Sequence, residues 1–215
     1  MKVIDLTHII SETMPVYPGT AKPKLKVSNT YEKDGFREAL LTMGSHTGTH
    51  IDAPAHIIEG KKTLDSFDAS QFVGKAIVID CRMLAEGEKI TAQHILKYGD
   101  KIKKAEFLLF NLGWDKRWGD DSYFGKYPCL SDDAVDIIIN GSYKGIGFDV
   151  ISIDPIKDSS LRIHKRLFLN KEIINIENLK NLDLCEGELF TFVCLPLKLE
   201  NADGSPARAI GILED

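Results

Sequence analysis

The chain has 215 residues and a formal net charge of −5, with 43% hydrophobic and 27% charged residues. This is the composition of an ordinary globular protein, and the acidic balance argues against a nucleic-acid partner or an anionic membrane surface, since both favour a basic face. A chain of this length can bury a core without disulfides. Because no linker, repeat or composition shift divides it, we expect a single domain over residues 1–215.

Segments rich in β-branched and aromatic residues recur along the chain and predict strands. In chain order they cover residues 2–6, 24–28, 39–43, 75–80, 105–110, 145–149, 173–176, 189–195 and 209–213. Helix signals are fewer and predict helices at 91–98, which ends before Gly99, at 131–140, which ends before Gly141, and at 161–169. Because strands outnumber helices, we expect an α/β layered domain with mixed, partly antiparallel sheets.

The four cysteines are scattered and include no Cys-x-x-Cys pair, which indicates free thiols in a reducing compartment rather than a disulfide framework. Asp5 and His8 interrupt the first residues, where a signal peptide would have an unbroken apolar stretch. No apolar run approaches the length of a membrane span. We therefore expect a cytoplasmic protein.

One segment combines three imidazoles, a carboxylate, a glycine and a proline within eleven residues. It reads His46-Thr47-Gly48-Thr49-His50-Ile51-Asp52-Ala53-Pro54-Ala55-His56. Neutral imidazole nitrogen and carboxylate oxygen are ligands of zinc and its divalent neighbours. Half of the chain's six histidines lie here, and little apolar periodicity accounts for them as core residues. We therefore expect a metal site, against the alternative that polar loop residues gather here by coincidence.

The spacing within this segment predicts which side chains converge. His46 and His50 would share a face of one helical turn, whereas Asp52 would leave that face and Pro54 disfavours helix before it. We expect a turn, or a single helical turn that unwinds, which curls His46, His50 and Asp52 around one ion. Three protein ligands leave positions open for water, as in catalytic sites. His56 lies just beyond, and we expect it to transfer protons; the alternative is that it orients a ligand.

Two further residues lie far downstream, His164 in the third predicted helix and Glu177 directly after a predicted strand. Taken alone, His164 has apolar neighbours at helical spacing and would be an ordinary packed or surface histidine. Glu177 alone would be a surface carboxylate. Spacing by itself assigns neither residue to the metal site.

The segment from His46 to His56 closely resembles the signature H-x-G-T-H-x-D-x-P-x-H of the cyclase family, which includes bacterial kynurenine formamidase (arylformamidase) and isatin hydrolase. Weaker pieces follow the family's order along nearly the whole chain: Asp5-Leu6-Thr7-His8, Met14-Pro15-Val16-Tyr17-Pro18-Gly19, Gly113-Trp114-Asp115, Arg117-Trp118-Gly119, Gly145-Ile146-Gly147-Phe148-Asp149, Ser152, Asp154, His164, Ile176-Glu177-Asn178-Leu179, Pro196-Leu197-Lys198 and Asp203-Gly204-Ser205-Pro206-Ala207-Arg208. The resemblance implies a swivelling β/β/α fold and an oligomer, commonly a dimer.

Residue by residue, the resemblance implies a metal centre held by His46, His50 and Asp52. In two-metal members the aspartate bridges to a second ion, which residues matching His164 and Glu177 also hold. Nitrogen and oxygen ligands without thiolate admit several divalent ions. We expect one or two Zn²⁺ per chain, with Mn²⁺ as the alternative.

Two more matches bear on the reaction. The residue that matches His56 is the family's proton donor and acceptor. In kynurenine formamidases of this type, the position matching Tyr17 is commonly tryptophan, which contacts the aromatic substrate. Tyr17 keeps an aromatic platform but changes its size and adds a hydroxyl. This departure weakens the assignment to N-formylkynurenine without affecting the assignment to hydrolysis.

The sequence thus predicts a metal-dependent hydrolase of a linear or cyclic amide of a small aromatic molecule, similar to the kynurenine formamidases that convert N-formylkynurenine to kynurenine and formate. Hydroxide on the metal would attack the carbonyl, and His56 would protonate the leaving nitrogen. An isatin hydrolase-like or other cyclic-amide hydrolase is the alternative. A metal-dependent small-ligand binding protein would keep the ligands without turnover. A purely structural metal site is disfavoured by mixed ligation without cysteine. We expect a homodimer or higher homo-oligomer.

Overall fold

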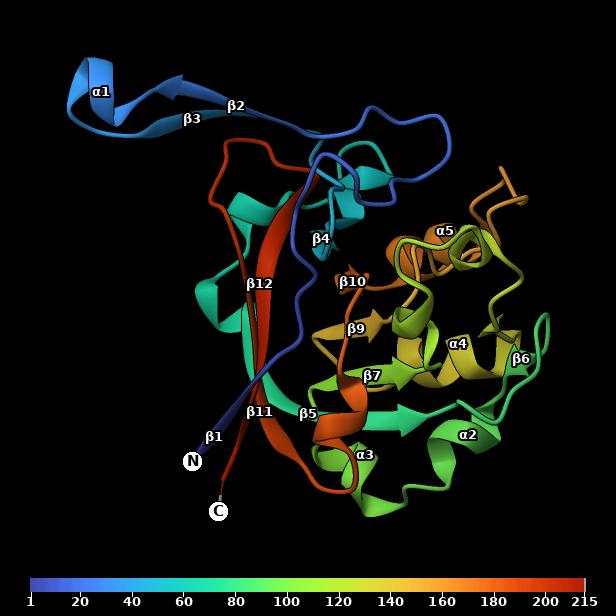
Figure 1. Cartoon of the computed structure of the whole chain (residues 1–215). Helices are drawn as coiled ribbons and strands as arrows, with labels where there is room; N and C mark the ends of the chain where they lie inside the picture. The colour runs from blue at the N-terminus through green and yellow to red at the C-terminus, as the bar shows by residue number, and fades with distance from the viewer. Residues whose placement is uncertain (215) are drawn as a thin grey trace.

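The computed structural model describes residues 1–214 (Figure 1). Its strands are β1 (Lys2–Asp5), β2 (Lys24–Asn29), β3 (Glu38–Thr42), β4 (His50–Asp52), β5 (Val73–Asp80), β6 (Lys89–Ile90), β7 (Phe107–Asn111), β8 (Cys129–Leu130), β9 (Gly145–Phe148), β10 (Ile174–Glu177), β11 (Phe190–Pro196) and β12 (Gly204–Leu213). Its α-helices are α1 (Tyr31–Asp34), α2 (Ala92–Leu96), α3 (Asp100–Lys104), α4 (Asp132–Asn140) and α5 (Arg162–Asn170). Short 3-10 helices include η1 (Pro54–His56), η2 (Leu64–Ser66), η3 (Ala69–Phe72), η4 (Trp114–Arg117), η5 (Asp121–Phe124) and η6 (Leu182–Cys185).

The largest sheet closes on itself. Its strand order is β1-β12-β11-β5-β7-β9-β10-β4, and β4 also pairs with β12, so seven strands form a ring to which β1 is added beside β12. The neighbours β5, β7, β9 and β10 are parallel. The pairs that involve β1, β4, β11 or β12 are antiparallel. The predicted α/β class with a mixed, partly antiparallel sheet is confirmed.

Both faces of the parallel strands are buried, which explains why β5 and β7 are almost continuous apolar runs. Ile77 and Ile79 of β5 pack in one core cluster with apolar residues of α2, α4 and α5, which lie on the same side of the sheet (Figure 1). Ala76 and Val78 point the other way and pack in a second cluster with residues of β7, β11 and β12. The ring is therefore a filled core that holds its strand ends in fixed positions.

Each predicted strand and helix has a counterpart in the structure, although β12 begins earlier than expected. The short elements β4, β6, β8, α1 and α3 were not predicted. The prediction of a turn over residues 46–52 is wrong for its last three residues, because His50–Asp52 forms strand β4. The main chain of β4 pairs with β10 on one side and with β12 on the other. Pairing within a sheet outweighs the weak local preference of these three residues.

Several features lie outside the ring. β2 and β3 pair with each other as a hairpin that projects from the body with α1 near its tip (Figure 1). The four cysteines are buried and free, as the sequence predicts. Within residues 1–214, no helix combines the length and the apolarity needed to cross a lipid bilayer.

Candidate active site

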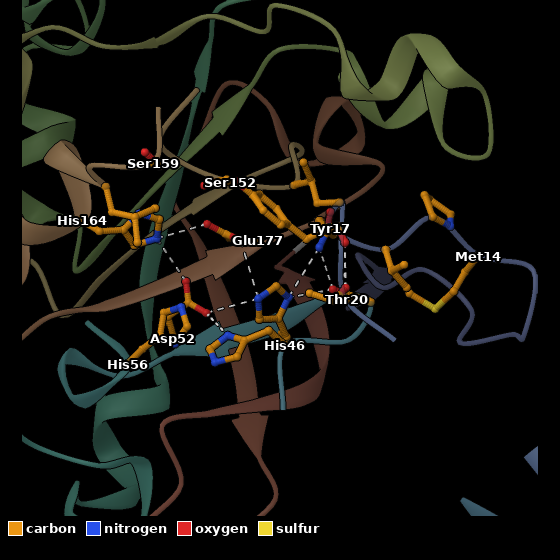
Figure 2. A pocket seen from close by; sticks show the side chains of 17 residues that line it. Met14, Tyr17, Thr20, His46, Asp52, His56, Ser152, Ser159, His164 and Glu177 are labelled. Atoms are coloured by element: carbon orange, nitrogen blue, oxygen red, sulfur yellow. Dashed lines mark hydrogen bonds and ion pairs between the residues drawn. The ribbon is translucent and has the colours of Figure 1, made fainter. Parts of the chain in front are cut away.

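A cavity of about 340 Å³ lies where β4, β10 and the beginning of α5 meet (Figure 2). Its walls contain every residue for which the sequence predicts a role, from four separate segments of the chain. These residues are Tyr17, His46, His50, Asp52, His56, His164 and Glu177. The fold thus brings His164 and Glu177, which lie far downstream in the sequence, next to the segment from His46 to His56.

Strand register explains why the central side chains converge. His50 pairs with Glu177, and Asp52 pairs with Asn175, across β4 and β10. Because alternate residues of a strand point to the same face, all four side chains lie on one side of this strand pair. All four are buried. Two short strands therefore build a polar cluster inside an otherwise apolar sheet.

The two carboxylate oxygens of Asp52 face different imidazoles. Its Oδ1 lies 2.7 Å from Nδ1 of His46 and 3.2 Å from Nε2 of His50. Its Oδ2 lies 3.6 Å from Nε2 of His164. Glu177 borders both groups, with Oε2 3.7 Å from Nε2 of His50 and Oε1 3.4 Å from Nε2 of His164 (Figure 2). The cluster therefore offers two adjacent sets of nitrogen and oxygen donors.

The other ring nitrogen of the two buried histidines is held from outside the cluster. Nδ1–H of His50 donates to the carbonyl of Gly48 at 2.8 Å, and Nδ1–H of His164 donates to Asp154 at 2.7 Å. Outer acceptors of this kind fix the tautomer and the orientation of metal-binding histidines. Each ring therefore turns Nε2 toward the carboxylates of Asp52 and Glu177. The donor chemistry fits a divalent cation.

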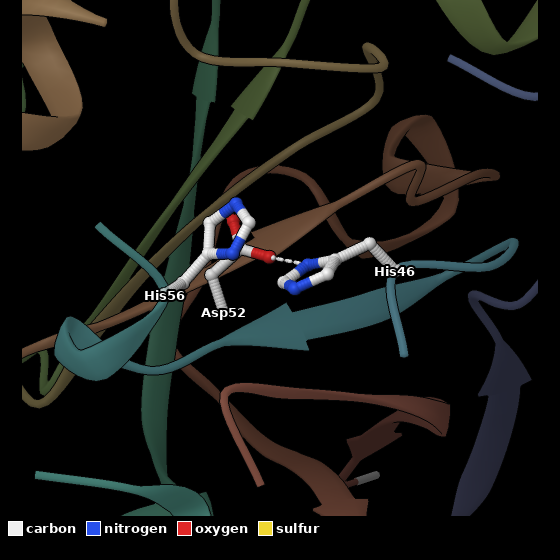
Figure 3. Close-up of side chains that lie close together, drawn as sticks. All are labelled: His46, Asp52 and His56. Atoms are coloured by element: carbon white, nitrogen blue, oxygen red, sulfur yellow. Dashed lines mark hydrogen bonds and ion pairs between the residues drawn. The ribbon is translucent and has the colours of Figure 1, made fainter. Parts of the chain in front are cut away.

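His46 and His56 lie together beside this cluster and share a partner. Nε2–H of His46 donates to Oδ2 of Asp203 at 3.0 Å, and Nδ1 of His56 lies 3.5 Å from the same oxygen. The two imidazole rings have centroids 3.8 Å apart (Figure 3). His56 is carried by η1, whose first residue, Pro54, fixes the entry into the turn. One ion could also be bound jointly by His46, Asp52 and His56. The position of His56 is therefore compatible with ligation of a metal ion and with proton transfer.

The charges of the cluster set its protonation. Burial lowers the pKa of His46, but the Asp52 and Asp203 carboxylates outweigh burial and raise it to about 9. Burial would raise the pKa of Asp52, yet the neighbouring imidazoles hold it well below its usual value. Burial lowers the pKa of His56, so its ring is neutral near neutral pH and able to accept a proton. A metal ion would therefore compete with protons for His46, whereas the neutral ring of His56 could accept a proton.

Comparison with known proteins shows to which family the chain belongs. Residues 4–155 match the model of the family described as Putative cyclase. The chain belongs to the cyclase family. The family predicted from the eleven-residue segment is therefore confirmed.

Relatives of this cyclase-family chain extend over its whole length. An uncharacterized protein of Methanocaldococcus jannaschii is 34% identical over 214 residues, which cover 99% of this chain and 100% of that protein. A kynurenine formamidase of Bacillus thuringiensis is 34% identical over 210 residues, which cover 96% of this chain and 95% of that protein.

Solved structures share the fold. An isatin hydrolase bound to the product analogue thioisatinate has a TM-score of 0.88 and 25% identity, covering 100% of this chain and 93% of that chain. A structure described as a potential metal-dependent hydrolase with cyclase activity has a TM-score of 0.79 and 30% identity, covering 98% of this chain and 96% of that chain.

Two loops complete the wall of this cyclase-family cavity. Tyr17, in the loop over residues 14–20, donates its hydroxyl to the carbonyl of Ile156 at 3.3 Å and so joins that loop to the segment before α5. The other aromatic residues of the family pattern lie elsewhere: Trp114 and Phe148 belong to the core, and Trp118 stacks on His8. Tyr17 is therefore the aromatic side chain of the pattern that lines the cavity.

The sequence assigns no role to Asp154, Asn175, Asn178 or Asp203, which the structure places around the histidines and carboxylates. Nδ2 of Asn175 donates to Asp52 at 2.8 Å and to Glu177 at 2.9 Å. Nδ2 of Asn178, a residue with left-handed backbone (φ 57°), donates to the Gly48 carbonyl at 2.8 Å. A polar residue between two isoleucines of a buried strand was the signal that could have revealed Asn175.

Proposed function

We propose that this chain, as a single domain, uses the cavity to hydrolyse an amide bond of a small aromatic molecule with the help of one or two divalent metal ions. The chain is an amide hydrolase of the cyclase family, in keeping with its kynurenine formamidase relatives. The observation that carries metal dependence is the position of Asp52, whose two oxygens face separate imidazole groups. Buried carboxylates and imidazoles gathered this closely are typical of a cation site.

His46, His50 and Oδ1 of Asp52 would hold one ion, and His164, Glu177 and Oδ2 of Asp52 would hold a second. Ligation by nitrogen and oxygen without thiolate leads us to favour zinc, with manganese as the alternative. A bound divalent ion polarises a carbonyl oxygen and makes hydroxide available from water at neutral pH.

The chain's own residues supply proton transfer and positioning. His56 takes up a proton early in the cycle and returns it to the leaving nitrogen. Its Nδ1 faces Asp203, which leaves Nε2 for the substrate. Tyr17, which lines the same cavity, offers an aromatic face to the substrate ring.

A cyclic amide is the second candidate substrate. The observation that favours it is the likeness to a structure named isatin hydrolase, with a TM-score of 0.88 over the whole chain. Ring opening would use the same groups, since His56 protonates the ring nitrogen when the bond to the carbonyl breaks. The two candidates differ in the shape of the substrate and share the site.

The test uses the purified protein loaded with zinc or with manganese. N-formylkynurenine, formanilide, isatin and small cyclic imides are assayed in parallel with the His56→Ala variant. Hydrolysis of at least one compound far above the rate of the variant is expected. No turnover above that rate on any of them overturns the proposal. A compound that raises the melting temperature and is recovered unchanged would support a metal-dependent binding protein instead.

A further inference from the structure

Two buried tyrosines lie behind the cluster of histidines and carboxylates, four residues apart in one segment of the chain. Tyr123 belongs to η5 and is fully buried, and Tyr127 lies just before β8 and is 3% exposed. Neither is among the described residues that line the cavity. A buried tyrosine hydroxyl needs a hydrogen-bond partner inside the protein. The partners of these two hydroxyls connect them to two different histidines.

The hydroxyl of Tyr123 fixes the orientation of the Asn178 amide. It donates to Oδ1 of Asn178 at 2.7 Å, whereas a second acceptor, the carbonyl of Asp149, is 3.5 Å away. With Oδ1 held in this way, Nδ2 of Asn178 faces the Gly48 carbonyl, to which it donates at 2.8 Å. The reverse orientation of the amide would place two acceptor oxygens, Oδ1 and the Gly48 carbonyl, against each other.

The Gly48 carbonyl is also the acceptor of His50. Nδ1–H of His50 donates to it at 2.8 Å, so this one oxygen accepts from the imidazole and from the Asn178 amide. A carbonyl oxygen has two lone pairs, and both are used here. The path from Tyr123 through Asn178 and Gly48 thus ends on the ring that turns Nε2 toward Asp52.

The main chain of Asn178 is fixed independently of Tyr123. Its N–H donates to the carbonyl of Val150 at 2.9 Å, and its carbonyl accepts from Oγ1 of Thr49 at 2.5 Å. Removal of the Tyr123 hydroxyl therefore leaves the backbone in place and releases the amide group alone. Oδ1 of Asn178 then loses its buried partner, which favours other orientations of the amide.

Tyr127 makes the corresponding connection to the other buried histidine. Its hydroxyl donates to the main-chain carbonyl of Asp154 at 2.8 Å. The carboxylate of Asp154 accepts from Nδ1–H of His164 at 2.7 Å and from the main-chain N–H groups of Ile163 and His164 at 2.8 and 3.0 Å. Tyr127 therefore holds the residue that orients His164 at the beginning of α5.

We propose that Tyr123 and Tyr127 are positioning residues, each for one set of metal-binding donors: Tyr123 orients His50, and Tyr127 orients His164. This assignment rests on the proposed metal site and is independent of the substrate. Because the two tyrosines act through different partners, loss of each hydroxyl loosens one histidine and leaves the other unchanged. A tyrosine that only filled the core would affect both histidines alike or neither.

The first test follows the ring Nδ1–H protons of His50 and His164 by NMR in the zinc-loaded protein. Both protons are donated to buried acceptors, so their exchange with water reports how firmly each ring is held. In Tyr123→Phe the proton of His50 is expected to exchange about tenfold faster, while that of His164 keeps its wild-type rate. In Tyr127→Phe the result is reversed. The unaffected histidine in each variant shows that the variant is folded.

The second test measures zinc affinity by competition with a chromophoric chelator. Each variant is expected to bind one ion about tenfold more weakly, at the lower end of the range for outer partners of metal ligands. Tyr98→Phe is the matched control, because the Tyr98 hydroxyl accepts the N–H of Asp80 at 2.8 Å, a hydrogen bond that involves neither histidine nor its partners. The control is expected to keep the wild-type affinity and both exchange rates.

A double-mutant cycle shows whether Tyr123 acts through Asn178. Glycine is the replacement at position 178, because the left-handed backbone there (φ 57°) would strain alanine. In the Asn178→Gly background, Tyr123→Phe is expected to cause no further change in zinc affinity or in the exchange at His50. The amide that the hydroxyl holds is already absent in that background.

Three results would overturn the assignment. The first is a zinc-binding protein in which both Tyr→Phe variants keep the wild-type affinity and exchange rates. The second is a pair of variants that each loosen both histidines equally. The third is a Tyr123→Phe effect that persists in full in the Asn178→Gly background. A chain that shows the expected crossed pattern, yet hydrolyses none of the test amides, would overturn the proposed function alone. A wild-type chain that binds no divalent ion would overturn both.

Discussion

Asp203 contacts His46 across 157 residues of sequence, with its Oδ2 3.0 Å from the Nε2 of that imidazole. The same oxygen lies 3.5 Å from Nδ1 of His56. One carboxylate therefore orients both a proposed metal ligand and the proposed proton carrier. The metal site and the proton-transfer site are linked through a residue that belongs to neither.

Asp203→Asn tests this link. The amide keeps the size of the side chain but removes the charge that favours the Nδ1-coordinating tautomer of His46. Metal affinity is expected to fall by about tenfold to a hundredfold, the usual cost of losing an outer partner of a metal ligand. Isothermal titration with Zn²⁺ measures it, with the exposed Asp183→Asn as control. An unchanged dissociation constant would show that His46 needs no support from Asp203.

Gly204 lies against the imidazole ring of His46, which leaves no room for a side chain at position 204. A Cβ added at Gly204 would lie 2.4 Å from Cε1 of His46. Gly204→Ala is expected to displace the imidazole and to weaken metal binding, while the paired strands keep the fold. Another glycine such as Gly187 would be a poor control, because its φ is positive and alanine would be strained there. Ser205→Ala is therefore the control, at the position next to Gly204. Wild-type metal affinity in Gly204→Ala would contradict the position of His46.

Removal of His56 is expected to affect turnover more than binding. In His56→Ala, kcat falls by about a hundredfold or more, the usual size for a general acid or base, while KM and metal content change little. Steady-state kinetics and elemental analysis on the same sample separate these quantities. A variant that loses its metal, yet turns over normally when saturated with zinc, would make His56 a residue that supports the ligands.

Glu177 decides between one metal ion and two. If both donor sets are filled, Glu177→Gln is expected to reduce the metal content by one ion per chain, because an amide is a weaker ligand than a carboxylate. Elemental analysis after dialysis measures the content. Retention of the full complement would count against Glu177 as a ligand of a second ion.

Asp149 gives the stability of the protein a dependence on pH that is unrelated to the metal. Burial raises the pKa of this carboxyl to about 7, although the backbone N–H groups of Leu112 and Trp114 favour its ionised form. Between about pH 4 and pH 7 the folded chain keeps a proton that the unfolded chain has lost. The free energy of unfolding therefore falls as pH rises through this window and levels off above it.

Urea unfolding at several pH values checks the contribution of Asp149. The slope is expected to approach about 1.4 kcal/mol per pH unit within the window for this group alone. In Asp149→Asn this part of the slope disappears. Identical slopes in the variant and the wild type would mean that Asp149 is ionised throughout.

Sequence patterns predicted the elements whose residues have a clear periodicity or a strongly apolar composition. β5 and β7 are apolar on both faces, so local composition sufficed. β4 escaped prediction because His50 and Asp52 flank a single apolar residue, and its strand conformation comes from pairing with β10 and β12. The helices α1 and α3 are too short to show a helical period.

The site was predictable where its residues are close in sequence. The eleven-residue segment predicted roles for His46, His50, Asp52 and His56 from chemistry and spacing, and the structure brings these four residues to the wall of one cavity. Asp203 lies in one of the weaker pieces of the family pattern, but its neighbours in sequence assign it no role, because its contact with His46 depends on the pairing of Gly204 with Asp52 across β12 and β4. The partners of the proposed ligands could be recognised only from the three-dimensional structure, because they come from distant strands of the ring.

The place of β12 in the sheet determines when the site can exist during synthesis of the protein. β12 follows every other strand in the sequence, yet it lies between β1 and β11 and also pairs with β4. Contacts between such distant segments form slowly, because long loops must close first. A growing chain on the ribosome therefore presents imidazoles and carboxylates that have not yet converged. If the proposed metal site is correct, the ion would be loaded after translation, into a chain that has already folded.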